Sequence, residues 1–255
     1  MARGERQDGQ NAVADRALDI LLSFSDDRPV LTANQLREAN NMSRSTIYRY
    51  IASLRSKGLI TEDQGGGFRL GPRLIAMARI ARRGNTILEI AKPFLQEMSE
   101  ACGEVVQLVE RVGRNVIVLE VVESRHRIGI TYLRGQMLPS PAGASAKVLL
   151  AFAPEDERED LMKMVDLHPY TAKSITDLAS LRASIEEVRR QGYALNDEEL
   201  DEGIRAIAAP IRGRDGVRYA TSIVGPSFRI TDEKLPELVA LVKRQARQIG
   251  ERYDA

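Results

Sequence analysis

The sequence predicts an α+β protein in which a small helical domain precedes a larger domain of strands and segregated helices. Through about the first hundred residues, apolar side chains recur mainly with the period of a helix. Beyond them the period changes to two, as in strands, and helical segments separate two groups of predicted strands. A length of 255 residues accommodates one large domain or two small ones.

The composition predicts a soluble, cytoplasmic protein. Hydrophobic residues make up 43% of the chain and charged residues 29%, and no stretch approaches the roughly 20 apolar residues of a membrane span. The polar first ten residues lack the apolar segment of a secretory signal, and the single Cys102 cannot form an internal disulfide. Because only His126 and His168 accompany it, no metal centre or cofactor is expected.

The first two helices have clear limits in the sequence. Residues 1–12 are expected to be a flexible tail, and apolar spacing predicts a helix over residues 13–24. Thr32 followed three residues later by Gln35 is a capping-box pattern. This pattern opens a second, short helix that ends near Ala39.

A third helix and a hairpin complete the N-terminal domain. Ser43 opens the helix, which runs to about residue 57, and Gly58 occupies the position of a C-cap glycine. Two short apolar runs, residues 59–61 and 68–70, flank a glycine-rich turn and indicate a β-hairpin. Three helices followed by a hairpin are the winged helix-turn-helix arrangement.

The rest of the chain alternates between the two periods. A fourth helix is predicted over residues 72–82, and Gly84-Asn85 is the best domain boundary. The later helices are predicted over residues 87–101, 144–152, 155–164, 178–191 and from about Pro236 to Tyr253. The strands are predicted over residues 105–109, 116–122, 128–132, 192–195, 206–212 and 218–224.

The third helix carries the side chains with which a helix-turn-helix reads DNA. The N-terminal residues of the second helix of such a motif contact base edges in the major groove. Ile47 and Ile51, four residues apart, form the expected buried side of this helix. The outward side chains are then Arg44, Ser45, Thr46, Tyr48 and Arg49, which can contact bases, sugar or phosphate.

The distribution of charge supports a DNA partner, although the net charge is only +1. Residues 1–82 hold 13 basic and 9 acidic residues, whereas the rest hold 24 and 27. Residues 41–58 and 64–83 contain no acid, and counter-ion release by basic groups dominates DNA affinity. The other expected DNA contacts are Thr32, Lys57, Arg69 and Arg73. A solvated basic surface without a DNA partner is the alternative.

A series of short motifs runs through the chain. In the first domain they are Ala-Leu-Asp-Ile-Leu at 17–21, Ser-Arg-Ser-Thr-Ile-Tyr-Arg at 43–49, Gly-Leu-Ile at 58–60 and Phe-Arg-Leu-Gly at 68–71. Later come Leu-Pro at 138–139, Ala142, Lys-Val-Leu-Leu-Ala at 147–151, Gln-Gly-Tyr-Ala at 191–194, Asp-Glu-Glu at 197–199, Gly203, Ile-Ala-Ala-Pro-Ile at 207–211 and Gly-Pro at 225–226. Together they resemble the IclR family of bacterial transcription regulators, from about residue 13 to the C-terminus.

The resemblance implies an architecture and a set of partners. It implies a winged helix-turn-helix domain over residues 13–71, a linker helix over 72–83, and a GAF-like effector domain over 84–255, in which helices flank an antiparallel sheet. It also implies a homodimer formed through the DNA-binding half, further paired into a dimer of dimers, on double-stranded operator DNA. A small organic acid, carboxylic or aromatic, would bind the effector domain and change the control of catabolic or metabolic genes.

The same resemblance implies where the acid binds, on the concave face of the sheet. Its residues here are Ala144, Ser145, Asn196, Ala206, Ser222 and Val224, with Leu133, Met137 and Leu138 as apolar walls. Free amides at the start of the helix at 144–152 can hold a carboxylate. Family members often have Cys at 206, some have an acid at 196, and Ser occurs at 224, so this pocket is expected to be less acidic and more apolar. Ala206 and Val224 are alternatively ordinary core residues.

Two other classes of function stay open. An enzyme is not indicated, because P-loop, zinc-protease and Ser-x-x-Lys motifs are absent and Cys102 has no histidine nearby in the sequence. The five acids within residues 196–202 lack a base or metal partner, so no residue is assigned a catalytic role. The other alternative is a winged helix that contacts proteins, joined to an oligomerising domain. An electrophoretic mobility shift that depends on salt and prefers one DNA sequence distinguishes a regulator from an enzyme and from a protein-contact module.

Overall fold

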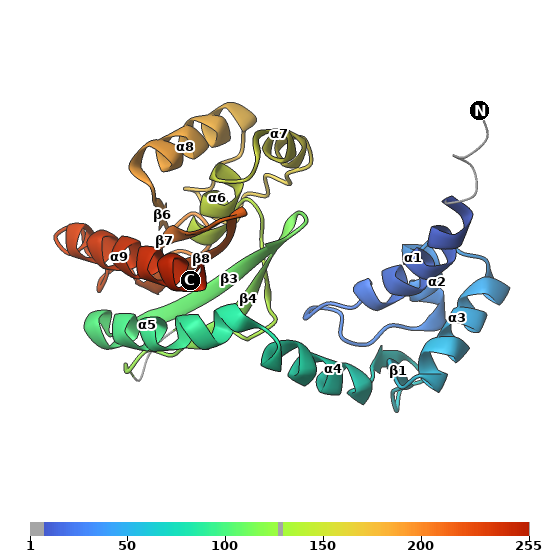
Figure 1. Ribbon diagram of the computed structural model, residues 1–255. Coiled ribbons are helices and arrows are strands. Elements are labelled where there is room, and N and C mark those ends of the chain that lie inside the picture. Colours follow the sequence, from blue (N-terminus) through green and yellow to red (C-terminus); the bar gives the residue numbers. More distant parts are fainter. Residues whose placement is uncertain (1–7, 127–129, 255) are drawn as a thin grey trace, which may run out of the picture. The chain divides into compact units, whose positions relative to one another are not determined.

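The computed structural model describes residues 8–126 and 130–254, and the chain divides into two units, residues 1–85 and 86–255 (Figure 1). The first unit contains the helices α1 (Asp8–Leu22), α2 (Ala33–Ala39), α3 (Arg44–Ser56) and α4 (Pro72–Arg83), and a hairpin of β1 (Ile60–Glu62) and β2 (Phe68–Leu70). The predicted winged helix-turn-helix order is confirmed. Helix α1 begins at Asp8, within the segment expected to be a tail, and residues 1–7 lie outside the described ranges.

Local signals start the two helices of the helix-turn-helix. The Thr32 hydroxyl accepts a hydrogen bond from the Gln35 amide at 3.2 Å, and the Gln35 side chain accepts one from the Thr32 amide at 2.8 Å. The predicted capping box is therefore present at α2. At α3 the Ser43 hydroxyl accepts a hydrogen bond from the Thr46 amide at 3.3 Å.

Backbone hydrogen bonds hold the hairpin against the segment that precedes α2. The amides of Leu31 and Phe68 each bond to the other residue's carbonyl, at 2.9 and 2.8 Å. Gly71, at the exit of β2, lies so close to Gly58 that an added Cβ would be 2.2 Å from the Gly58 carbonyl oxygen. Glycine is therefore required at position 71, where the end of α3 and the start of α4 cross.

The second unit is one antiparallel sheet with helices on both faces (Figure 1). The strands, in the order β5-β4-β3-β8-β7-β6, are β5 (Met137–Leu138), β4 (Asn115–Val122), β3 (Val105–Val112), β8 (Gly216–Pro226), β7 (Ile204–Gly213) and β6 (Ala194–Asp197). Helices α5 (Thr86–Cys102) and α9 (Leu235–Tyr253) cover one face. Helices α6 (Ala144–Ala151), α7 (Glu155–Lys163) and α8 (Leu178–Gln191) lie on the other. The α+β class is confirmed.

Strand alternation divides the core between these two faces. Ile207, Ala209 and Ile211 of β7 pack with α5 and α9, whereas Ala206 and Ala208 pack on the α6 side. The α6 side of β6, β7 and β8 carries small side chains, which lets the wholly buried helix α6 approach the sheet. We call this surface the concave face, after the prediction.

The prediction for the edge of the sheet is wrong. A strand was expected over residues 128–132, yet residues 130–132 are not in a strand, and residues 128 and 129 lie outside the described ranges. The edge strand is β5, in which Met137 and Leu138 pair with Ile117 and Val116 of β4. Apolar alternation identifies a segment that can form a strand, but it does not identify which segment takes the free edge.

The start of β6 also differs from the prediction. The strand begins at Ala194 rather than at Gly192, because Gly192 is used to end helix α8. Its φ of 78° is left-handed, and its amide bonds to the Val188 carbonyl at 2.9 Å. In the part of the chain that the structure describes, no helix is long and apolar enough to cross a membrane.

Candidate DNA-binding surface and effector site

Helix α3 separates a buried side from an exposed one. Ile47, Tyr50, Ile51 and Leu54 are buried, and this set includes Tyr50, which the sequence analysis did not place there. The side chains expected to read bases are exposed or half-buried: Arg44, Ser45, Thr46, Tyr48 and Arg49. The geometry of the helix thus leaves the two arginines and Tyr48 available to a groove.

The hydroxyls at the start of α3 are joined to one another. Ser43 Oγ lies 2.8 Å from Thr46 Oγ1 and 3.2 Å from Ser45 Oγ. Two residues predicted to contact DNA therefore lie at the helix N-terminus, whose amides and dipole favour a phosphate. Thr32, another predicted contact, uses its hydroxyl in the α2 capping box.

Two predicted backbone contacts lie where the end of α3 crosses the start of α4. Lys57 precedes Gly58, whose ideal Cβ position is 3.6 Å from Arg73 Cβ. Both Lys57 and Arg73 are exposed. The Gly58–Gly71 crossing therefore brings Arg73 beside the residue that follows Lys57, which the sequence pattern did not reveal.

Charge on the hairpin side is partly neutralised. The guanidinium of Arg55 lies 2.6 Å from the Glu62 carboxylate, and that of Arg69 lies 3.9 Å from Asp63. Basic residues from the two stretches without acids thus pair with acids at the end of β1 and directly after it. Arg69 is the predicted contact that this affects most directly.

Three of the predicted effector residues form a row across the concave face. Asn196 of β6 is opposite Ala206 of β7, and Ala206 is opposite Val224 of β8. All three are buried, with Ala206 and Val224 part of the core against α6. Ala144 and Ser145, at the start of α6, are buried on the same side. Gly143 caps this helix without a side-chain hydrogen bond, so its first amides lack a side-chain acceptor.

A glutamine that the sequence analysis missed lies beside this row. Ser222 Oγ donates to Gln107 Oε1 at 3.3 Å, and the two residues are paired across β8 and β3. Gln107 is 1% exposed, and its Nε2 has no hydrogen-bond partner among the described residues. A buried, unsatisfied amide costs free energy unless something bonds to it. The sequence does point to Gln107, because this polar residue interrupts the apolar run over residues 105–109.

A buried ion pair fixes the loop that follows β6. Lys147 of α6 is 3% exposed and lies 2.5 Å from the Glu199 carboxylate, and it also donates to the Leu195 carbonyl. Asn196 Oδ1 accepts a hydrogen bond from the Glu199 amide at 2.9 Å. The predicted effector residue Asn196 is thus held in place from its own loop.

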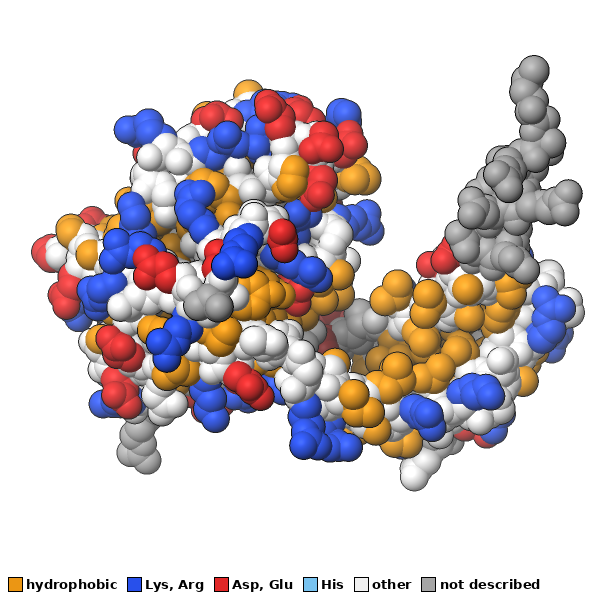
Figure 2. Space-filling view, in the orientation of Figure 1, with side chains coloured by type: hydrophobic (Ala, Val, Ile, Leu, Met, Phe, Trp, Pro, Cys, Tyr) orange, Lys and Arg blue, Asp and Glu red, His pale blue; other side chains and the backbone are white. Residues whose placement is uncertain are grey.

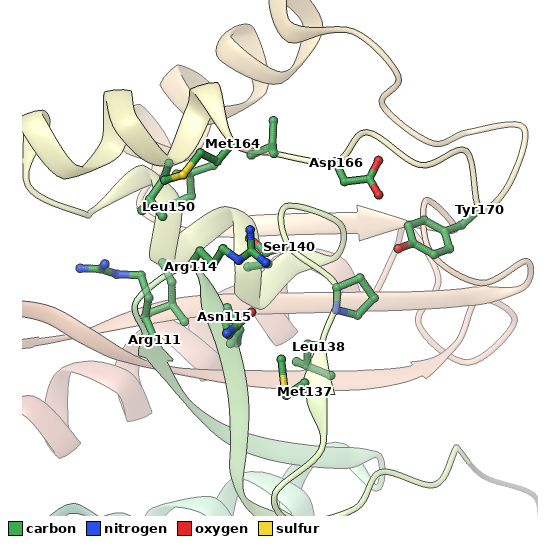
Figure 3. A pocket seen from close by; sticks show the side chains of 16 residues that line it. Arg111, Arg114, Asn115, Met137, Leu138, Ser140, Leu150, Met164, Asp166 and Tyr170 are labelled. Atoms are coloured by element: carbon green, nitrogen blue, oxygen red, sulfur yellow. The ribbon is translucent and has the colours of Figure 1, made fainter. Parts of the chain in front are cut away.

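The predicted apolar walls are divided between two environments. Leu133 is 62% exposed and Met137 is 56% exposed, so neither closes the row described above. Met137 and Leu138 instead line a cavity of about 580 Å³ between β4, β5, α6 and α7 (Figure 3). Arg111, Arg114, Asn115, Ser140, Asp166 and Tyr170 also line this cavity, and none of them was a predicted site residue.

The groups considered for catalysis are otherwise engaged. Burial raises the pKa of the Cys102 thiol to about 11, which keeps it protonated and unreactive. Three of the acids of residues 196–202 enter ion pairs: Asp197 with Arg205, Glu198 with Lys173 and Glu199 with Lys147. Within the described ranges, no group of His, Cys, Asp and Glu side chains could hold a metal.

Two family models match the chain. The model described as the IclR helix-turn-helix domain matches residues 13–64, and the one described as the bacterial transcriptional regulator IclR C-terminal domain matches residues 81–251. The chain belongs to the IclR family. It is a transcription regulator with a DNA-binding and an effector domain, and not an enzyme.

Individual relatives of this IclR-family chain agree with that assignment. It is 31% identical over 231 residues to the HTH-type transcriptional regulator KipR of Bacillus subtilis, covering 90% of this chain and 92% of KipR. The crystal structure of the Thermotoga maritima IclR superimposes with a TM-score of 0.69 at 28% identity, over 96% of this chain and 100% of that one. An IclR homolog from Microbacterium hydrocarbonoxydans, complexed with 4-hydroxybenzoate, gives 0.73 at 25% identity over 93% and 97%.

Proposed function

We propose that this IclR-family regulator binds operator DNA through α3 and that a small organic acid bound to its second unit changes operator affinity. The observation that carries the first part is the N-terminal half of α3, where Arg44, Tyr48 and Arg49 are exposed. Arginine can donate two hydrogen bonds to the edge of guanine, whereas tyrosine contacts phosphate or sugar. Lys57 and Arg73 then supply phosphate contacts where the end of α3 meets the start of α4. The protein would act in the cytoplasm, where the DNA lies.

An organic acid is the effector class that the concave face supports. The uncapped amides at the start of α6 attract an anion, and Ser145, Asn196 and Ser222 add buried polar groups on the same side of the sheet. Gln107 Nε2, which has no hydrogen-bond partner among the described residues, adds a donor on the same face. The homolog that is complexed with 4-hydroxybenzoate is a precedent for an aromatic acid in this fold. Catabolic or metabolic genes are the corresponding targets.

A homodimer is proposed through an apolar surface of the first unit. Exposed apolar side chains gather on this unit in Figure 2. On α1 and α4 they are Val13, Leu18, Leu22, Ile75, Met77 and Ile80, each between 51% and 79% exposed. Contiguous apolar surface of this kind marks an interaction site. Two such dimers would then pair as a dimer of dimers.

A mobility-shift titration with the DNA upstream of the protein's own gene tests DNA regulation. We expect a shift that prefers this sequence over a scrambled duplex and that weakens steeply as salt rises. Equal binding to both duplexes would leave only a non-specific basic surface. The absence of any shift would favour the protein-contact alternative.

Variants on the concave face test the effector assignment. Ser222→Ala or Ser145→Ala should reduce the change in operator affinity caused by an added acid, while binding without acid stays the same. A thermal-shift screen of small organic acids identifies the acid to use, because a ligand of the native state raises its stability. If operator binding without acid fails first, the effector assignment is wrong.

A further inference from the structure

The cavity of Figure 3 is lined by polar groups that lack side-chain partners within the described part of the chain. Its volume of about 580 Å³ is within the range of small-molecule sites. Arg114, Asn115 and Ser140 line it, and no side-chain hydrogen bond or ion pair joins any of the three to another described residue. A guanidinium, an amide and a hydroxyl are together the donors that bind a carboxylate.

The backbone holds two of these donors in place. Val112 of β3 pairs with Asn115 of β4, so Gly113 and Arg114 form a two-residue turn, with a φ of 59° at Gly113. Arg111, at the preceding position of β3, is bound by Glu157 at 2.8 Å, while its buried Nε lacks a partner among the described residues. Strand pairing therefore fixes the backbone positions of Arg114 and Asn115 in the wall of the cavity.

Much of the remaining wall is apolar. Leu138 follows Met137 on β5, Leu149 and Leu150 come from α6, and Met164 follows α7. These side chains offer contact area to the body of a ligand but no hydrogen bonds. A bare inorganic anion would leave this part of the cavity unfilled.

The end away from Arg111 has the opposite charge. In Figure 3, Asp166 and Tyr170 lie on the far side of the cavity from Arg111, and the Tyr170 hydroxyl points inward. Burial and then the nearby Asp166 raise the pKa of Tyr170, so its phenol stays protonated and can donate. Asp166 has no hydrogen bond or ion pair with any other described residue. A second carboxylate at this end would be repelled.

We propose that this cavity binds a monocarboxylate with an apolar body, whose carboxylate contacts Arg114, Asn115 and Ser140. Asp166 makes the cavity reject dicarboxylates of the same length. This cavity is a second acid site, separate from the concave face, and its binding of the acid does not depend on DNA.

Calorimetric titration of the full chain with three matched probes tests this directly. The probes are 4-methylbenzoate, the uncharged 4-methylbenzamide, and terephthalate, in which a second carboxylate replaces the methyl group. We expect 4-methylbenzoate to bind at least about tenfold more tightly than 4-methylbenzamide, since the charge-assisted bonds are lost in the amide. The affinity for 4-methylbenzoate should also exceed that for terephthalate by about fivefold or more. Equal affinities for the three, or no binding of 4-methylbenzoate, would overturn the proposal.

Variants then assign the site. Arg114→Gln should weaken 4-methylbenzoate by about tenfold and Asn115→Ala by a smaller factor, whereas Arg244→Gln on α9 should have no effect. Arg114 also lines a neighbouring cavity of about 1030 Å³, whereas Asn115 and Asp166 do not. Substitutions at Asn115 and Asp166 therefore show which of the two cavities binds the acid. Asp166→Asn should bring terephthalate close to 4-methylbenzoate.

The concave face is the competing site for 4-methylbenzoate. If Ser222→Ala abolishes 4-methylbenzoate binding and Arg114→Gln leaves it unchanged, the acid binds at the row of Asn196, Ala206 and Val224. That outcome overturns the cavity proposal and leaves the proposed regulator intact. Failure of the regulator proposal is detected separately, because operator DNA would then show no mobility shift with the protein.

Discussion

Arg49 shows what single residues contribute to the DNA-binding surface. It is exposed in the N-terminal half of α3, directly before the buried Tyr50, so its backbone position is set by the core. Lys57 is also exposed, but it lies at the far end of the helix, away from the residues that enter a groove. The two cations should therefore contribute to different parts of DNA binding.

Arg49→Ala should weaken binding to the specific operator by about 1–3 kcal/mol and change non-specific binding little. Lys57→Ala should weaken binding to all sequences alike and lower the slope of log affinity against log salt by about one. Fluorescence anisotropy with operator and scrambled duplexes, across a range of salt, measures both. A uniform loss in Arg49→Ala would make Arg49 a backbone contact.

The buried pair of Lys147 and Glu199 gives a second prediction at this scale. Lys147 is 3% exposed and Glu199 is 17% exposed, so removing the carboxylate leaves the less hydrated charge without a partner of opposite charge. We expect Glu199→Gln to lower the free energy of unfolding by about 3 kcal/mol, and Lys147→Met by less. Urea denaturation measures this. The exposed pair of Arg182 and Glu159 is the control, and Glu159→Gln should have little effect. The reverse order at the buried pair would refute this account.

At the scale of elements, helix starts were predictable and strand partners were not. Thr32 and Ser43 cap their helices through bonds to residues three positions away, which the sequence displays directly. The segment at 130–132 has the apolar pattern of a strand, but Met137 and Leu138 occupy the edge beside β4. Strand pairing depends on competition between segments, and local pattern does not report that competition.

The capping box yields a prediction about one element. Thr32→Ala removes the acceptor for the Gln35 amide and should destabilise the first unit by about 1 kcal/mol, whereas Thr32→Ser keeps the bond and should be close to wild type. Hydrogen exchange of the α2 amides measures the effect. Operator binding by the folded Thr32→Ser variant shows separately whether the hydroxyl or its methyl group matters to DNA. Unchanged exchange in Thr32→Ala would show that the cap contributes no stability.

At the scale of the whole molecule, association determines whether two recognition helices act together. Ile80 is 63% exposed on α4, within the apolar surface proposed for the homodimer. Ile80→Asp should raise the dimer dissociation constant at least about tenfold, because burying an isoleucine contributes roughly 1.5–3 kcal/mol and a buried carboxylate opposes association. Sedimentation equilibrium measures this. Leu178→Asp, at a 47% exposed leucine of α8, is the control. Identical behaviour of the two variants would place the dimer interface elsewhere.

Coupling between acid and operator also belongs to this scale. An acid changes DNA affinity only if it binds more tightly to one conformational state of the chain than to another. By reciprocity, operator DNA should then change the affinity for the acid by the same factor. Titrating the acid with and without operator gives that factor independently of any assumed motion.

The sequence by itself determined the helix-turn-helix, its caps, the outward arginines of α3, and the family to which the chain belongs. These features depend on helical period and on bonds between residues three or four positions apart, so a short window contains them. Only the tertiary structure joined Asn196, Ala206 and Val224 into one row, set Gln107 beside Ser222, and brought Arg114 and Ser140 into one cavity. Those neighbours are set by strand register and by helices packing on a sheet, which join residues up to 115 positions apart.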